Sequence, residues 1–231
     1  MASMEQRIIL PDGLELRLKR SSRARRMTLR VPRDGSDPIL TLPVRVPLHE
    51  GRAFAESRQG WLQQALGRVP ARQTVTCGVR FPVGGAHLLI TAADIRQVQV
   101  QDDLLLVPQN RPAGVVVSAW MRQAALARLR PACDRFSAAL GRPYRAIALR
   151  DTKSRWGSCT HDGRLMFSWR LAMAPLPVLT YVAAHEVAHL AHMDHSARFW
   201  AQVHDLMPDH APHRAWLKTH GGDLMQWQFR D

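Results

Sequence analysis

The N-terminal third of the chain alternates apolar and polar residues with the two-residue period of a half-buried β-strand. This alternation covers residues 14–19 and returns over 27–31, and the strongly basic connection over 21–26 would join the two strands as a hairpin. Another strand is expected over 39–46. Apolar residues then recur at the spacing of an amphipathic helix over 47–66, so we predict a β-rich segment with one helix.

The middle of the chain combines short strands with one long helix. Residues 73–108 alternate in short runs rich in Val, Leu and Ile, with turn signals at Gly84-Gly85 and at residues 101–103. They predict three or four antiparallel strands. A long helix is expected over 111–140. Because proline has no backbone N–H, Pro131 is expected to kink or split this helix.

The C-terminal part returns to strands before two further helices. Strands are expected over 147–149, 156–160 and 165–169. Apolar residues then recur at three- and four-residue steps from Leu176 to Leu190, which predicts a helix with one buried face. A second helix is expected over 196–207.

The first of these two helices carries a histidine-glutamate-x-x-histidine motif, and a further histidine follows six positions after it. Residues i and i+4 lie about 40° apart around a helix axis, so the imidazoles of His185 and His189 project from one face and can bind one metal ion. His195 is the expected third ligand if the chain turns back after the helix. Three protein ligands and one water form an open, catalytic zinc site, beside which Glu186 would act as general base.

The patterns together predict one continuous α+β unit without repeats or a flexible linker. Its N-terminal part, residues 1–110, is expected to be β-rich and basic, with one helix. Its second part, residues 111–231, is expected to pack the metal-binding helix on a mostly antiparallel sheet.

Zinc and a neighbouring carboxylate indicate hydrolysis. A zinc-activated water with Glu186 as general base would cleave peptide bonds, so we expect a zinc-dependent peptidase that acts on a protein or peptide substrate. Beyond the zinc itself, the sequence leaves three candidates for stabilising the oxyanion: His192, Arg155 and Tyr181.

A polar, aromatic and glycine-bearing segment begins the strand expected at 156–160. A substrate chain can lie extended beside such a strand and bond to its backbone, so Arg155, Trp156, Gly157 and Ser158 are candidate substrate-binding residues. The competing interpretation makes Trp156 a core residue and pairs Arg155 with a carboxylate. Cys159 is not expected to bind the metal, because a fourth protein ligand would close the site.

The positive net charge of the chain has more than one interpretation. The formal net charge of +13 favours an acidic partner such as nucleic acid, and Arg17, Lys19 and Arg30 on the basic hairpin are the best candidates for contacting phosphate. Two simpler interpretations compete with this one. The hairpin face can be merely solvated, and an arginine-rich composition with only three lysines can follow from genome composition.

The sequence also indicates where the protein works. No stretch approaches the roughly 20 apolar residues of a membrane span, and residues 1–13 lack the pattern of a secretory signal. The three cysteines, Cys77, Cys133 and Cys159, are odd in number and far apart, which is typical of reduced thiols. We therefore expect a cytoplasmic protein without membrane association.

Four stretches of the sequence carry a resemblance to a known family. They are Ser154-Arg155-Trp156-Gly157-Ser158-Cys159, Tyr181-Val182, the His185 to His189 motif, and His195-Ser196 leading to Phe199-Trp200. Together they resemble the YgjP-like metallopeptidases and, more distantly, are similar to the SprT-like and Wss-type peptidases. The resemblance implies a zincin fold, zinc on His185, His189 and His195, and Glu186 as base. Unlike the metzincins, which have a glycine at the turn before the third ligand, this chain has His192.

Several alternatives stay open at this point. The more distant relatives imply proteolysis of DNA-bound proteins, so the chain could be a DNA-associated module in which binding dominates. The metal could instead be structural, or the protein could be a zinc hydrolase that acts on something other than peptides. A histidine-bearing core helix without metal is a further interpretation, since eight of the eleven histidines lie between residues 185 and 220.

Overall fold

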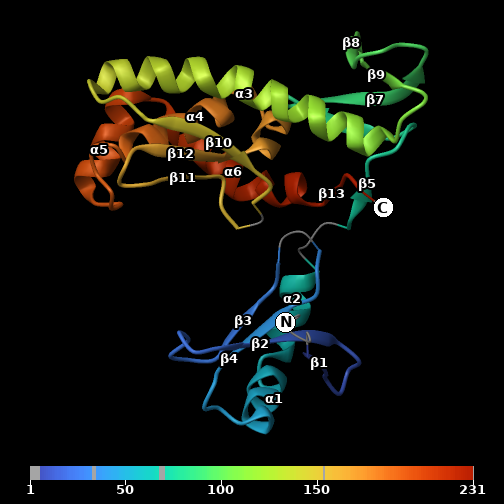
Figure 1. Cartoon of the computed structure of the whole chain (residues 1–231). Coiled ribbons are helices and arrows are strands. Elements are labelled where there is room, and N and C mark those ends of the chain that lie inside the picture. The colour runs from blue at the N-terminus through green and yellow to red at the C-terminus, as the bar shows by residue number, and fades with distance from the viewer. Residues whose placement is uncertain (1–5, 33–34, 68–70, 153, 231) are drawn as a thin grey trace. The chain divides into compact units, whose positions relative to one another are not determined.

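The computed structural model describes residues 6–32, 35–67, 71–152 and 154–230 (Figure 1). The chain forms two compact units, Met1–Arg72 and Gln73–Asp231. This division differs from the expected one, in which the N-terminal part extended to residue 110. Residues 73–110 belong to the second unit because their strands bury side chains in the same hydrophobic cluster as the long helix that follows them.

The N-terminal unit is a four-stranded sheet packed on two helices. Its strands lie in the order β1-β2-β4-β3: β1 Gln6–Ile9, β2 Glu15–Ser21, β4 Ile39–Pro43 and β3 Thr28–Arg30. One face of the sheet buries alternate residues of β2 and β4 against Ala55 and Leu62 of the helices, and this forms a small core of its own. The single helix expected over 47–66 is two helices, α1 Leu48–Glu56 and α2 Gln59–Leu66.

The hairpin predicted between β2 and β3 is wrong. Strand β4 lies between them, parallel to β2 and antiparallel to β3. Alternation correctly identifies the strands but cannot say which of them are neighbours, and here the leucines of β4 fill the centre of the core. Arg17, Lys19 and Arg30 still share the sheet face that points away from the helices, by register with Ile39 and Thr41. Nucleic-acid binding by this face stays a prediction.

The second unit begins with a four-stranded sheet in the order β6-β7-β9-β8. The strands are β6 Arg80–Val83, β7 Ala86–Ala93, β9 Leu104–Pro108 and β8 Gln99–Gln101. The predicted turns are confirmed, with positive φ at Gly84, Gly85 and Asp102. The expectation of antiparallel strands throughout is wrong for β7 and β9, which pair in parallel because the β8–β9 hairpin returns alongside β7.

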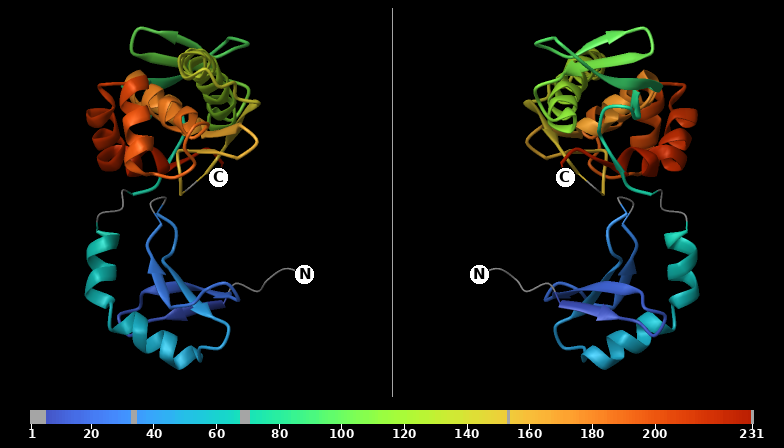
Figure 2. Two further views of the ribbon diagram at one scale, coloured as in Figure 1. Left: turned by 90° about the vertical axis from the view of Figure 1, so that its left-hand side faces the viewer. Right: turned by 90° about the vertical axis from the view of Figure 1, so that its right-hand side faces the viewer.

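A long helix, α3 Ala113–Leu140, follows this sheet. It runs through Pro131 without a break, although the proline was expected to kink or split it (Figure 1). The residues around the proline, Leu129, Ala132 and Cys133, are all buried, and this packing holds the helix together where one backbone hydrogen bond is missing. In the end-on views of Figure 2, α3 lies next to both the β6–β9 sheet and α4.

The remaining elements surround the predicted metal residues. A three-stranded sheet has the order β10-β12-β11, with β10 Ala146–Arg150, β12 Arg164–Ser168 and β11 Gly157–Cys159. A 3₁₀ helix, Trp169–Met173, leads into α4 Leu176–Ala188, which is followed by α5 Ala197–Leu206 and α6 His210–Met225. Strand β13 Trp227–Gln228 then pairs with β5 Gln73–Thr74. The 3₁₀ helix and α6 were not predicted from the sequence pattern.

This architecture confirms a mixed fold of helices and sheets and corrects one detail of it. Strands β10 and β12 are parallel, so only β11 adds an antiparallel pair to the sheet beside α4. Within the described ranges, no helix combines the length and the apolar character that a membrane crossing would need. The three cysteines are all free, in agreement with the expected reduced thiols.

Arg170 ties the 3₁₀ helix to the C-terminal end of the chain. Its side chain is 6% exposed and donates to Asp151 through Nε (2.6 Å) and Nη2 (3.3 Å). Its Nη1 also donates to the carbonyl oxygens of Leu224 and Trp227, each at 3.0 Å. One buried guanidinium thus connects the end of β10, the 3₁₀ helix and the end of α6.

Replacing Arg170 by methionine is expected to lower the free energy of unfolding by about 3 kcal/mol, because it leaves a carboxylate and two carbonyls without their donor. Chemical denaturation followed by circular dichroism measures this loss. Arg145→Met is the matched control: that arginine pairs with Asp162 at an exposed site, so its loss should cost less than about 1 kcal/mol. Equal effects of the two substitutions would contradict the role of Arg170.

Candidate metal centre

Helix α4 and the turn after it deliver the three predicted histidines. His185 lies in the last turn of α4, and His189 is its C-cap residue. The helix therefore ends close to the position predicted by the apolar pattern, which extends to Leu190. Helix α5 starts at the N-cap Ser196, whose hydroxyl accepts from the N–H of Phe199 (3.4 Å), while Asp194 Oδ1 accepts from the N–H of Ser196 (3.2 Å). This turn brings His195 back beside the end of α4.

The three imidazoles converge. Their ligand atoms all lie within 4.8 Å of one another, and Nε2 of His185 is 3.2 Å from Nε2 of His195. Two nitrogens at about 2.0 to 2.1 Å from a tetrahedral zinc ion lie about 3.3 to 3.4 Å apart. The side chains present therefore fit a metal ion.

A backbone hydrogen bond orients the imidazole of His189. Nδ1 of His189 is 2.9 Å from the carbonyl oxygen of His192, so this nitrogen donates and Nε2 keeps its lone pair. His192, which was a candidate for stabilising the oxyanion, thus contributes through its backbone. Its side chain replaces the glycine of the metzincin turn, and its carbonyl orients one of the three candidate metal ligands.

Phe199 forms an apolar support under all three rings. Its own side chain is fully buried, and its ring centroid lies 4.9 Å from that of His185, 4.4 Å from His189 and 4.9 Å from His195. In the sequence, Phe199 stood out only as one of the residues that resemble the family, without a role in the site. A packed aromatic ring restricts the rotation of each imidazole and so holds the nitrogens where they converge.

The electrostatics of the cluster favour neutral imidazoles. Burial lowers the pKa of His185 to about 3, and the neighbouring histidines and Arg214 add to this effect. Burial also lowers the pKa of His189, which its hydrogen bond to the carbonyl of His192 partly opposes. A neutral imidazole is the form that binds metal ions, since its unprotonated nitrogen carries the lone pair.

The side chain of Glu186 projects from α4 toward β11 and lies next to the histidine cluster. It is 4% exposed, and burial raises its pKa to about 8, an effect that Arg155 partly opposes. A Cβ atom placed on Gly157 would lie 2.5 Å from Oε1 of Glu186. The backbone of β11 therefore approaches the carboxyl group as closely as it does only because residue 157 has no side chain. A carboxyl group with a pKa near neutrality can take up a proton and return it.

The four predicted substrate-binding residues lie along and just before β11, at the open edge of its sheet. The carbonyl of Trp156 accepts from the N–H of Ser168 (2.8 Å), and Ser158 is opposite Met166 in the register. Because hydrogen-bonded pairs alternate along an antiparallel ladder, the backbone N–H and C=O of Gly157 and Cys159 point away from β12. The four candidates therefore differ in their backbone: Trp156 and Ser158 use their backbone groups within the sheet, whereas those of Gly157 point outward.

The side chains of this segment have different surroundings. Trp156 is half-buried and packs against α6, where a Cβ atom on Gly221 would lie 3.1 Å from its ring. Arg155 is exposed and acts on the buried Glu186 through its charge. Cys159 stays outside the histidine cluster, and burial together with the charge of Glu186 raises the pKa of its thiol to about 11.

Helix α6 brings a second layer of residues to the cluster that the sequence did not reveal. His210 stacks on both Tyr181 and Trp200, with centroid distances of 6.4 and 6.1 Å. Arg214, one turn further along, holds its Cζ atom 4.1 Å from the centroid of Trp200. Burial raises the pKa of Tyr181, and the charge of Arg214 partly opposes this. Only contacts in space show these roles, because α6 lacks a metal-binding motif.

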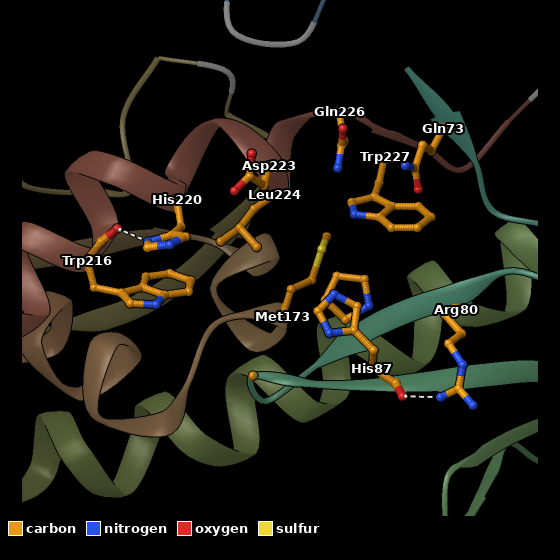
Figure 3. Close-up of a pocket in the computed structure, with 12 residues that line it drawn as sticks. Gln73, Arg80, His87, Met173, Trp216, His220, Asp223, Leu224, Gln226 and Trp227 are labelled. Atoms are coloured by element: carbon orange, nitrogen blue, oxygen red, sulfur yellow. Dashed lines mark hydrogen bonds between the residues drawn. The ribbon is translucent and has the colours of Figure 1, made fainter. Parts of the chain in front are cut away.

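A separate pocket of about 270 Å³ lies between α6 and the β6–β7 hairpin (Figure 3). Trp216 and His220 stack along one side of it, at a centroid distance of 4.8 Å, and Met173, Leu224 and Trp227 provide further apolar lining. Neither Glu186 nor any of the three converging histidines lines this pocket. It is therefore distinct from the metal centre.

Converging histidines beside a buried glutamate are the residues of a metal-dependent hydrolase. A family model described as YgjP-like, metallopeptidase domain, matches residues 25–220. The chain therefore belongs to the YgjP-like metallopeptidase family, which confirms the resemblance noted in its sequence. Family membership implies a metal ion and a protein substrate.

Other comparisons add little. Among solved structures, the chain is similar to the metallopeptidase zymogen of Pyrococcus abyssi abylysin, with 19% sequence identity and a TM-score of 0.35. The match covers 39% of this chain and 93% of that one, and it is too distant to bear on activity. A search of curated proteins gave no match.

Alanine at His185, His189 or His195 is expected to abolish stoichiometric metal binding, since each substitution removes one of three converging ligands. Elemental analysis of the purified protein after dialysis measures the bound metal. His220→Ala is the matched control, because this histidine lies outside the cluster, and it should bind as much metal as the wild type. Undiminished metal content in all three alanine variants would show that the cluster is not the metal site.

Proposed function

We propose that this protein is a zinc-dependent peptidase with a zincin-like site. One observation carries the proposal. The ligand nitrogens of three imidazoles lie within 4.8 Å of one another, beside a buried glutamate whose carboxyl group packs against the edge strand β11. His185, His189 and His195 would hold the ion. Three nitrogen ligands and an open fourth position favour zinc in a catalytic role over a structural one.

When bound, the zinc ion supplies Lewis acidity, which lowers the pKa of water and polarises a carbonyl group. The protein contributes the proton transfers. Glu186 is the general base in this proposal: its carboxyl group takes a proton from the attacking water and delivers it to the leaving amine. The burial that raises its pKa to about 8 suits both steps, because the protonated form is accessible near neutrality.

The edge of β11 is the proposed binding site for the substrate backbone. Its outward-pointing groups belong to Gly157 and Cys159, so an extended peptide would hydrogen-bond to these two residues. Trp156 and Ser158 support the strand from within the sheet. Arg155, exposed and close enough to act on Glu186, is the candidate for the oxyanion or for a polar group of the substrate.

Glu186→Gln tests the mechanism. Glutamine has nearly the same shape but cannot accept the proton, so hydrolysis of a casein or peptide substrate should fall by about 10²- to 10⁴-fold while zinc content is unchanged. Fluorogenic peptide assays and elemental analysis on one preparation measure the two properties. Full activity in this variant would disprove the role of the glutamate.

Gly157→Ala tests the close approach of β11 to Glu186. A methyl group 2.5 Å from Oε1 must displace the carboxyl group or the strand, so we expect kcat/KM to fall at least about tenfold with zinc still bound. Gly60→Ala is the control, because a Cβ atom there has no neighbour within 4 Å. Wild-type kcat/KM in Gly157→Ala would mean that the contact does not position the base.

A further inference from the structure

Arg214 lies at the rim of the candidate metal centre, and within the described residues its contact is the ring of Trp200. It is exposed on α6, with its Cζ atom 4.1 Å from the centroid of the Trp200 ring. The same ring lies against two of the metal-binding residues, with centroids 5.7 Å from His185 and 6.1 Å from His195. Trp200 therefore links the guanidinium directly to the histidine cluster.

The positive charge of Arg214 lies close to the candidate centre. The guanidinium stacks on Trp200, and the centroid of that ring is 5.7 Å from that of His185. The guanidinium therefore lies near the α4 face that carries this histidine. A fixed cation at this place attracts a negatively charged group of whatever binds across the site.

Within the described ranges, no carboxylate of the chain forms an ion pair with Arg214. Asp209, which precedes it on α6, is 3.3 Å from Nε2 of His213 instead. The arginines Arg80, Arg145, Arg164 and Arg170 each have an aspartate partner within 3.3 Å. Arg214 differs from them in that its described contact is the face of an indole, which leaves its N–H groups available.

We propose that Arg214 binds a carboxylate of the substrate and so makes the enzyme selective for acidic peptides. A guanidinium presents paired N–H donors that match the two oxygens of a carboxylate, and the Trp200 ring limits the freedom of the side chain before binding. This specificity rests on the proposed peptidase function. The carboxylate belongs to a glutamate or aspartate near the cleaved bond, or to the C-terminus of the substrate.

The experiment separates binding from cleavage. Dye-labelled peptides that differ only in one internal residue, Glu, Gln or Lys, carry an amidated C-terminus, and a fourth, neutral peptide has a free C-terminal carboxylate. Fluorescence anisotropy gives their affinity for the zinc-loaded Glu186→Gln protein, and mass spectrometry gives their cleavage by the wild type. We expect the peptide with the internal glutamate, or the one with the free C-terminus, to bind about tenfold more tightly than the amidated Gln peptide.

Substitutions at position 214 decide whether the arginine causes the preference. Arg214→Gln should abolish it, and Arg214→Glu should reverse it so that the Lys peptide binds best. Arg135→Glu is the matched control: this arginine is also exposed beside an aromatic ring, 4.6 Å from that of Phe136, but on α3. It should retain the wild-type preference. The same preference in Arg214→Glu as in the wild type, or equal affinity for all four peptides, would overturn the proposal.

The two hypotheses can fail separately. Cleavage of peptides without a preference for carboxylates would leave the peptidase function standing and reject the role of Arg214. Carboxylate binding that depends on Arg214, without cleavage of any peptide, would reject the peptidase function and retain the binding site. The peptide that gains from Arg214 identifies the source of the carboxylate.

Discussion

The metal centre depends on the close approach of the Gly157 backbone to the carboxyl group of Glu186. This contact joins β11 to α4, and a Cβ atom at position 157 would lie only 2.5 Å from Oε1. It removes Glu186 from solvent, which raises the pKa of its carboxyl group, and it sets the distance between the edge strand and the histidines. Other elements hold α4 in place: α3 and the 3₁₀ helix pack against it, and Arg170 anchors the 3₁₀ helix to the chain end.

Helix α5, which follows the motif, is as much a part of the site as the motif itself. Phe199 of α5 packs against all three imidazoles, and the guanidinium of Arg214 on α6 stacks on the neighbouring Trp200. Three consecutive helices therefore contribute to one small region: α4 and its C-cap carry two of the converging histidines and the carboxyl group, α5 provides an aromatic support, and α6 provides a cation. An aromatic support of this kind orients neutral imidazoles without adding a competing ligand or charge.

The sequence was informative wherever the chemistry is local. The spacing of His185 and His189 places both rings on one helical face, and the turns at Gly84-Gly85 and residues 101–103 follow from turn-forming residues. Contacts between distant segments were out of its reach. Alternation could not show that β4 separates β2 from β3, nor that β7 and β9 run parallel, since both depend on which strands share a core. For the same reason it gave no sign that Gly157 packs against Glu186, that Phe199 lies under the three imidazoles, or that Arg214 stacks on Trp200.

Strand β11 has a further consequence for how the protein behaves in solution. A sheet edge that is open to a substrate peptide, as proposed for β11, is also open to the edges of other chains, and this is a common route to aggregation. Here the edge is only three residues long and is followed directly by the Thr160–Gly163 turn. So short an edge offers too few backbone groups for another sheet to extend it stably. The short length of β11 thus limits pairing of this edge with other sheets, while the backbone groups of Gly157 and Cys159 point away from β12.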